Sequence, residues 1–114
     1  MLKIEAIFRP ERVNAVTEAL TSVGVTGFHY QNITGQGQQQ GVEVITGRGS
    51  QTATRSSVPK TLLVTIVSNE KKDDVVNAII ESTRSGDIGD GKIFITSIDS
   101  VVRIRTGDKD EEAL

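Results

Sequence analysis

Hydrophobic and polar residues alternate along the first nine positions of the chain. The residues of one face are all apolar: Leu2, Ile4, Ala6 and Phe8. This alternation predicts a strand with one buried face. Ile7 interrupts the polar face, which indicates that the second face is partly covered as well.

The following segment has helical periodicity. Pro10 suits the start of a helix, because its fixed φ fits the first turn. Apolar side chains then recur at helical spacing: Val13, Val16, Leu20 and Val23. Gly24 is placed as the terminator. We expect a helix from Glu11 onward, and then a second strand from Phe28 to Thr34.

The stretch from Gly35 to about Ser57 has no periodic pattern and is rich in glycine and glutamine. Val42–Ile45 either extends the preceding strand or belongs to a loop that orders on contact. Loops longer than ~12–15 residues are uncommon in compact domains unless they are functional or disordered. The regular glycines at the base and the flanking strands favour a functional loop over a disordered insertion.

The second half repeats the strand and helix pattern. Leu62–Val67 is almost continuously apolar, which predicts a central strand covered on both faces. Ser68 and Asn69 are placed to cap a helix. The buried stripe of this helix is expected at Val75, Val76, Ile79 and Ile80. Two more strands are expected at Lys92–Ile98 and Val101–Arg105, followed by a solvated acidic tail.

This order of elements predicts the fold class. Two β-α-β halves give an α+β, ferredoxin-like βαββαβ fold, a four-stranded antiparallel sheet with two helices on one face. We expect one domain over residues 1–114, with a long loop at about 37–57 between the second and third strands. Ile7, Leu63 or its neighbours, and Ile95 are expected on the face that the helices leave open. A homo-oligomer is the default partner for such an apolar face.

Composition excludes several classes of protein and site. The 114 residues carry a formal net charge of −2, which weighs against a general nucleic-acid or membrane-surface binder. There is no cysteine and the single histidine is His29, so disulfides, thiolate metal sites and His-rich sites within one chain are excluded. No apolar stretch approaches the ~20 residues of a membrane span. Charged residues near Met1 are unlike a signal peptide, and a cytoplasmic protein without direct membrane insertion is expected.

One stretch has an unusual local composition. Three glycines, Gly86, Gly89 and Gly91, lie within six residues and are followed at once by Lys92. Successive N–H groups in a glycine turn form a concave nest that suits an anion. A lysine at its edge adds a point charge that phosphate oxygens use.

A pair of arginines, Arg103 and Arg105, follows eleven residues after Lys92. If Val101–Arg105 is a strand, both guanidinium groups leave it on the same face. A nest, a lysine and two such arginines match a triphosphate tail. The alternative is an ordinary glycine turn that leads into an edge strand with solvated basic residues.

Catalytic chemistry finds little support in the chain. No clear nucleophile–base pair is present, so we expect a protein that is not an enzyme. Asp90 in the glycine turn either orients a water molecule or has a structural role, and the structural role is favoured.

These motifs together resemble the nitrogen regulatory PII signal-transduction proteins, essentially from end to end. The matching segments are Ala6–Pro10, Gly24–Gly27, Gly35–Gly41, Pro59–Lys60, Gly86–Phe94 and Arg103–Gly107. The resemblance implies a compact homotrimer that binds ATP or ADP in the clefts between subunits. It also implies that 2-oxoglutarate binds through the Mg²⁺ of Mg-ATP. The long loop then docks onto a membrane transporter, such as an ammonium transporter, or onto a nitrogen-metabolism enzyme.

The resemblance also implies roles for individual residues. The residues implied in nucleotide binding are Ile7, His29, Gly35, Gly37, Gln38, Gln39, Ile88, Gly89, Asp90, Gly91, Lys92, Arg103 and Arg105. Those implied in 2-oxoglutarate binding are Arg9, Gln39, Gly41, Lys60 and Gly89, with Gln39 also meeting Mg²⁺. Those implied in partner contacts are Val42, Ile45, Arg48, Thr52 and Arg55.

Departures from the family pattern concern regulation and ligand preference. Thr52 stands nearest to the tyrosine that is often uridylylated, and the only tyrosine, Tyr30, falls in a predicted strand. The loop is about two residues longer than the common version. Gln38 and Gln40 stand where arginine and lysine are frequent, which lowers the positive charge near the phosphates. His29 stands where threonine is usual, and either contacts the adenine or fills the strand surface.

Three other functions stay open. One is an adenylate-only sensor that controls a different transporter. The second is a slow ATP hydrolase, and the third is a purely structural trimer.

Overall fold

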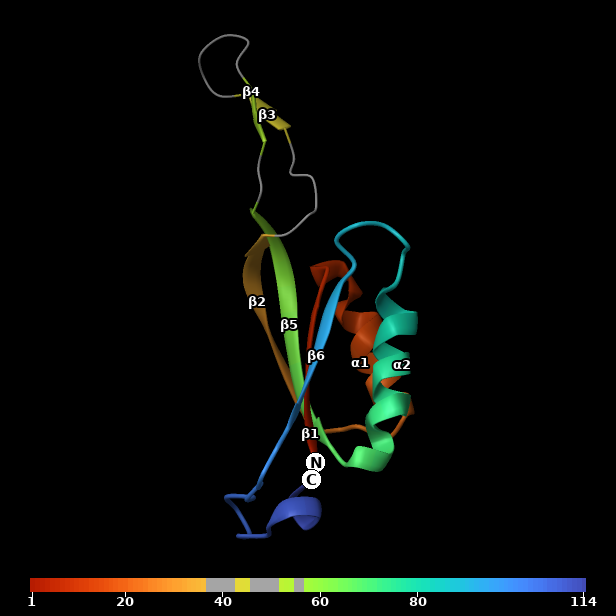
Figure 1. Ribbon diagram of the computed structural model, residues 1–114, viewed down its shortest axis with the longest axis vertical. Coiled ribbons are helices and arrows are strands. Elements are labelled where there is room, and N and C mark those ends of the chain that lie inside the picture. The colour runs from red at the N-terminus through yellow and green to blue at the C-terminus, as the bar shows by residue number, and fades with distance from the viewer. Residues whose placement is uncertain (37–42, 46–51, 55–56) are drawn as a thin grey trace.

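The computed structural model describes residues 1–36, 43–45, 52–54 and 57–114 (Figure 1). Its main sheet has four antiparallel strands in the order β2-β5-β1-β6. The strands are β1 (Leu2–Phe8), β2 (Phe28–Gln36), β5 (Ser57–Val67) and β6 (Gly91–Ser97). Helices α1 (Val13–Ser22) and α2 (Lys72–Thr83) lie side by side on one face of this sheet. The predicted α+β, ferredoxin-like arrangement is confirmed.

The core lies between the helices and the face of β1 that the sequence predicted. Ile4, Ala6 and Phe8 are buried, and they pack with residues of both helices and of β5 in one cluster. The alternation in β1 therefore places every second side chain under α1 and α2.

Helix α1 begins and ends as the sequence predicted. Pro10 opens a 3₁₀ turn, Pro10–Arg12, that leads into the helix. Gly24 takes a φ of 88° after its last turn, a conformation that glycine adopts at little cost.

The predicted side-chain cap of the second helix is wrong. Ser68 is extended and its side chain caps nothing; a 3₁₀ turn, Asn69–Lys71, leads into α2 instead. The Asn69 side chain accepts a hydrogen bond of 2.9 Å from the Met1 amino group, so it serves the start of β1 rather than the helix.

The face of the sheet opposite the helices is only partly covered. In β5, Thr61, Leu63 and Thr65 are buried, whereas the alternate residues Leu62 and Val64 are half-buried. The prediction that both faces of this strand are covered is therefore wrong within one chain.

Ile95 was expected on this open face and that expectation is wrong. It pairs with Ile4 and so lies on the helix side, where it stays exposed because β6 is an edge strand. The neighbouring residue, Phe94, pairs with Glu5 and therefore faces the open side of the sheet.

The predicted strand Val101–Arg105 is also wrong. Residues 104–106 form a turn, and only Val102 makes a strand-like bridge, to Lys109. Gly107, with a φ of 73°, allows the chain to fold back on itself. The partner of this segment is therefore its own continuation and not the main sheet.

Within the long loop, β3 (Glu43–Ile45) pairs with β4 (Thr52–Thr54) in a separate two-stranded sheet. It lies beyond the ends of β2 and β5 (Figure 1), and Ile45 pairs there with Thr52. The remaining loop residues of interest lie outside the described residues: Gly37, Gln38, Gln39, Gly41, Val42, Arg48 and Arg55. Among the described helices, none has the length and apolar character needed to cross a membrane.

Candidate functional site

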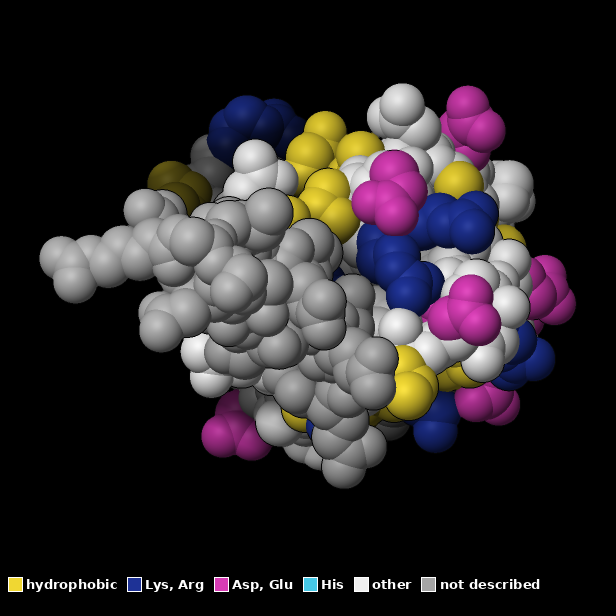
Figure 2. Space-filling view, turned by 90° about the horizontal axis from the view of Figure 1, so that it is seen from above, with side chains coloured by type: hydrophobic (Ala, Val, Ile, Leu, Met, Phe, Trp, Pro, Cys, Tyr) yellow, Lys and Arg dark blue, Asp and Glu magenta, His cyan; other side chains and the backbone are white. Residues whose placement is uncertain are grey.

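The glycine turn lies between the end of α2 and the start of β6, at the end of the sheet where β1 finishes. Figure 2 looks onto this end, where basic and acidic side chains gather side by side. Three of its residues have positive φ: Gly86 (93°), Gly89 (99°) and Gly91 (121°). The local conformation is therefore one that few other residues adopt.

Gly91 is required by a close approach between strands. A Cβ atom at this position would lie 1.8 Å from the carbonyl oxygen of Ile7 on β1. The absence of a side chain here is thus explained by packing of β6 against β1, independently of any ligand.

The Asp90 carboxylate is the hub of the turn. It accepts hydrogen bonds from the backbone N–H of Ser85 (2.8 Å), the Ser85 hydroxyl (2.5 Å) and the backbone N–H of Gly86 (2.9 Å). It also forms an ion pair with Arg9. These donors, the Ser85 hydroxyl first, hold the pKa of Asp90 well below its usual range.

An internal anion, the Asp90 carboxylate, therefore occupies the amides at the start of this turn. The structural role that the sequence favoured for Asp90 agrees with these contacts. Ser85 was not predicted, and the serine directly before the glycine turn was the only signal that the sequence offered.

Two cations hold the carbonyl groups of the same turn. Arg9 donates to the carbonyl oxygen of Ile88 (2.8 Å) and to the Ser85 hydroxyl (3.2 Å). Lys60 donates from Nζ to the carbonyl oxygen of Gly89 at 2.5 Å. Burial, and then the nearby positive charge of Arg9, lower the pKa of Lys60 from its ordinary value.

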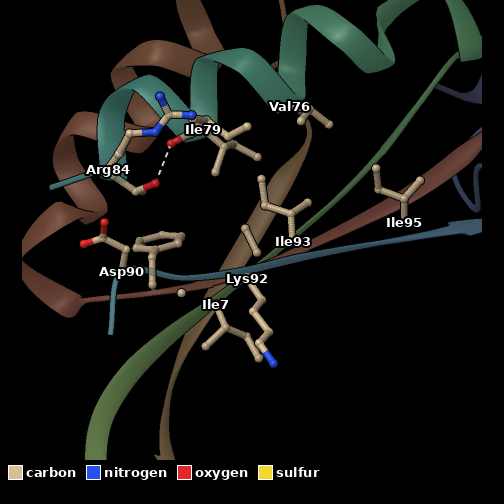
Figure 3. Close-up of a pocket in the computed structure, with 13 residues that line it drawn as sticks. Ile7, Val76, Ile79, Arg84, Asp90, Lys92, Ile93 and Ile95 are labelled. Atoms are coloured by element: carbon tan, nitrogen blue, oxygen red, sulfur yellow. Dashed lines mark hydrogen bonds between the residues drawn. The ribbon is translucent and has the colours of Figure 1, made fainter. Parts of the chain in front are cut away.

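Arg84, at the end of α2, is exposed and forms no ion pair with the described residues. Lys92 is likewise exposed and has no ion pair among them. It pairs with Ile7 across the strands, and both side chains point away from α2 to the open face of the sheet (Figure 3). Gly35, on the opposite edge strand β2, lies close to Lys60 and not to Lys92, since a Cβ atom there would be 3.5 Å from Cγ of Lys60.

A cavity of about 400 Å³ lies on the other side of β6. Its lining is mostly apolar, from Val76 and Ile79 on α2 and from Ile93 and Ile95 on β6, with Asp90 near one end (Figure 3). Lys92 points away from the apolar part of this cavity, so the cavity and the cationic surface use opposite faces of one strand.

The arginines lie at the opposite end of the sheet. β6 runs antiparallel to β1 from Gly91 beside Phe8 to Ser97 beside Leu2, a span of about 20 Å for seven residues. The glycine turn and the arginine pair therefore do not meet within one chain.

The arginines themselves are held loosely. Arg103 donates to the Asp108 carboxylate and to the carbonyl oxygen of Leu114, both at 3.4 Å. Arg105 is exposed, and the side chain of Ile104 between them is 100% exposed.

His29 belongs to this second end. It pairs with Val64, and both line a cavity of about 530 Å³ together with Lys71 and Leu114. The predicted site residues thus form two groups, one around the glycine turn and one around His29, Arg103 and Arg105.

No metal centre is visible in the described part of the chain, which contains no cluster of three His, Cys, Asp or Glu side chains. Gln39, the residue implied in Mg²⁺ binding, lies outside the described residues.

Comparison with known proteins gives consistent matches along the whole chain. The family model described as nitrogen regulatory protein P-II matches residues 1–108. Nitrogen regulatory protein P-II 2 of Methanothermobacter thermautotrophicus is 42% identical over 115 positions, covering 100% of this chain and 97% of the relative. Nitrogen regulatory protein P-II of Synechocystis sp. is 42% identical, with 100% of both chains covered. That of Rhizobium etli is 44% identical, with 97% of each covered. These matches confirm the resemblance inferred from the sequence motifs.

Proposed function

The chain belongs to the nitrogen regulatory protein P-II family of signal-transduction proteins, and from this membership we propose that it senses adenine nucleotides at sites between the subunits of a homotrimer. The proposed ligands are ATP or ADP, with Mg²⁺ and 2-oxoglutarate as further ligands. The protein is proposed to act in the cytoplasm as a regulator and not as an enzyme.

The separation of the two groups of cations supports a site between subunits. Lys92 and the glycine turn lie at one end of the sheet, and Arg103 and Arg105 lie about 20 Å away at the other. A polyphosphate spans much less than this distance, so one chain cannot use both groups on one ligand. Head-to-tail contact would place the arginines of one copy against the turn of the next, and such contacts form a ring when the rotation between copies closes.

The open face of the sheet supports an oligomer independently. It carries a row of half-buried or exposed apolar side chains: Ile7, Leu62, Val64, Ile66 and Phe94. Contiguous apolar surface of this kind marks an interaction site. Burying it against other copies removes it from water.

The surroundings of the turn suit a dicarboxylate as well as a phosphate. Arg9 and Lys60 reach neighbouring carbonyl groups of the same turn, so an acid bound there would meet both cations. Carboxylates prefer such charge-assisted hydrogen bonds. Gln39 would supply an oxygen to Mg²⁺, which takes few protein ligands and keeps phosphate oxygens.

The output is proposed to be the long loop between β2 and β5. It leaves the main sheet at Gln36 and returns at Ser57, next to the residues proposed to bind nucleotide. A ligand shifts the loop only as far as its affinity differs between loop conformations. The proposed target is a transporter, which would recruit the protein to a membrane, or an enzyme of nitrogen metabolism.

Mixing two variants tests the site between subunits. Lys92→Ala and Arg103→Ala alone should each weaken ADP binding about tenfold or more in calorimetry, because each removes a charged phosphate contact. Lys72→Ala, which removes an exposed cation from α2, is the control and should bind normally.

Unfolding and refolding the two variants together should then restore part of the tight binding. A mixed ring contains an interface with an intact turn from one copy and an intact Arg103 from the other. Failure of the wild-type protein to bind ATP or ADP would refute the proposal. Binding without any recovery on mixing would refute the site between subunits. Nucleotide binding that ignores 2-oxoglutarate would leave an adenylate sensor.

A further inference from the structure

Two successive carbonyl groups of the glycine turn are each held by a buried or half-buried cation. Arg9 binds the carbonyl oxygen of Ile88 at 2.8 Å, and Lys60 binds that of Gly89 at 2.5 Å. Lys60 is only 8% exposed, so its position is restricted by packing. The two cations lie near one another, because Phe8, next to Arg9, pairs with Thr61, next to Lys60, on adjacent strands. Both carbonyl groups therefore point to the same side of the turn.

The direction of a carbonyl group determines the direction of the next amide. In a trans peptide the C=O and the following N–H point in opposite directions, and the chain has no cis peptide bond. The N–H groups of Gly89 and Asp90 consequently point away from Arg9 and Lys60. The φ of 99° at Gly89 allows successive peptides to face the same way, as in anion-binding nests. The Gly89 amide makes no hydrogen bond to the described residues, and the Asp90 amide makes none of standard length and angle, although residues 88–89 form a turn.

We propose that Arg9, Lys60 and Asp90 are positioning residues that aim the Gly89 and Asp90 amides at the phosphates of the nucleotide. This inference rests on the proposed function. It assigns the phosphate donors to the second half of the turn, because the amides of Ser85 and Gly86 in the first half are taken by the Asp90 carboxylate.

Asp90 contributes in two ways, through the first half of the turn and through Arg9. It fixes the first half of the turn through three hydrogen bonds from Ser85 and Gly86, and it holds Arg9 through an ion pair. The low pKa of Asp90 keeps its carboxylate ionised throughout the physiological pH range. The carboxylate can therefore accept these hydrogen bonds at every physiological pH.

The shape of the arginine side chain matters as much as its charge. Nη1 of Arg9 donates hydrogen bonds to the Asp90 carboxylate and the Ser85 hydroxyl, while Nη2 donates one to the carbonyl group of Ile88. The planar fork reaches these acceptors from one position, whereas a lysine has a single nitrogen. Arg9→Lys should therefore keep part of the function, and Arg9→Gln should keep less.

The test is calorimetric titration of full-length variants with ADP and with inorganic pyrophosphate. Mg²⁺ and oxoacids are left out, and each variant is first checked for the mass of a trimer. Asp90→Asn is expected to weaken both ligands on the order of tenfold. Asp87→Asn is the matched control, since Asp87 lies in the same turn and its carboxylate has no hydrogen bond to the described residues; it should bind normally.

Two further readouts separate positioning from a loss of folding. In NMR hydrogen exchange, the Gly89 and Asp90 amides should lose their ADP-dependent protection in Asp90→Asn, while core amides of β1 stay protected. Arg9→Lys should recover part of the affinity that Arg9→Gln loses. Should Asp90→Asn fail to fold, the two Arg9 variants decide the question.

The outcomes separate the two proposals. Wild-type protein that binds ADP, with Asp90→Asn and Arg9→Gln binding equally well, would overturn this inference and leave the proposed function intact. Wild-type protein that binds neither ADP nor pyrophosphate would overturn both.

Discussion

The two ends of the main sheet present their cations in opposite ways. At the glycine turn, Arg9 and Lys60 are bound to groups of their own chain at hydrogen-bond distances. At the other end, Arg103 has contacts of only 3.4 Å, and Ile104 beside it is fully exposed. The cations of the glycine turn are thus fixed by contacts within the chain, whereas Arg103 and Ile104 have few contacts with the described residues of their own chain.

The largest effect should come from Gly91→Ala at the organised end. The new Cβ atom would lie 1.8 Å from the Ile7 carbonyl oxygen, at a φ of 121°. We expect a loss of about 4 kcal/mol or more in the free energy of unfolding, or no folded protein. Urea unfolding followed by circular dichroism measures this.

Gly107→Ala is the counterpart at the loose end. Its φ is 73°, but a Cβ atom there would meet nothing within 4 Å, so the expected cost is only about 1–2 kcal/mol. Equal costs for the two variants would contradict the contrast between the ends.

Ile104→Ser tests whether a neighbour covers the loose end. Within one chain this side chain is fully exposed, so replacing it should not weaken the fold. If it is buried between subunits, the trimer should lose about 1.5–3 kcal/mol of apolar burial per interface and dissociate at a higher protein concentration. Analytical ultracentrifugation of a dilution series measures this, and an unchanged dissociation curve would place Ile104 outside the interface.

Acid should affect the organised end through Asp90. Its pKa is lower in the folded protein than in the unfolded chain, so the stability it contributes is present above about pH 4 and is lost as the pH falls further. Asp90→Asn should therefore flatten the acid side of the stability profile, measured by thermal unfolding from pH 6 to pH 2. Asp87→Asn, in the same turn, should leave the profile as in the wild type.

Asp108→Asn should have the smallest effect. The ion pair of Asp108 with Arg103 is 3.4 Å long and both side chains are more than one third exposed. Such exposed pairs contribute about 0–1 kcal/mol, so thermal unfolding should change little. A large loss of stability would show that the loose end is more ordered than its contacts indicate.

The sequence was sufficient to predict the elements that bury a regular apolar stripe. The alternation in β1 and the helical spacing from Val13 to Val23 each correspond to a single arrangement against the core. The segment Val101–Arg105 alternates apolar and basic residues in the same way, yet it is not a strand. Alternation describes which side a residue would face, but it does not supply the neighbouring strand that a ladder requires.

The candidate site could be predicted by residue type but not by arrangement. The residue types alone indicated positive φ at Gly86 and Gly89 and a lysine at the edge of the turn. The Asp90 carboxylate accepts hydrogen bonds from the Ser85 and Gly86 amides because of the path of the turn, and residue types do not specify that path. Arg103 lies far from Lys92 because β6 carries the chain along the whole length of the sheet between them. Residue types do not specify the direction of that strand.

The close approach at Gly91 affects what a glycine at this position indicates about function in a related sequence. The backbone of Ile7 leaves no room for a side chain at this position, so a descendant that had lost every ligand would still need glycine there to fold. A glycine at position 91 is therefore no marker of nucleotide binding. Under the proposed function Lys92 is the informative position, because its side chain forms no ion pair with the described residues and so has no evident structural role to preserve it.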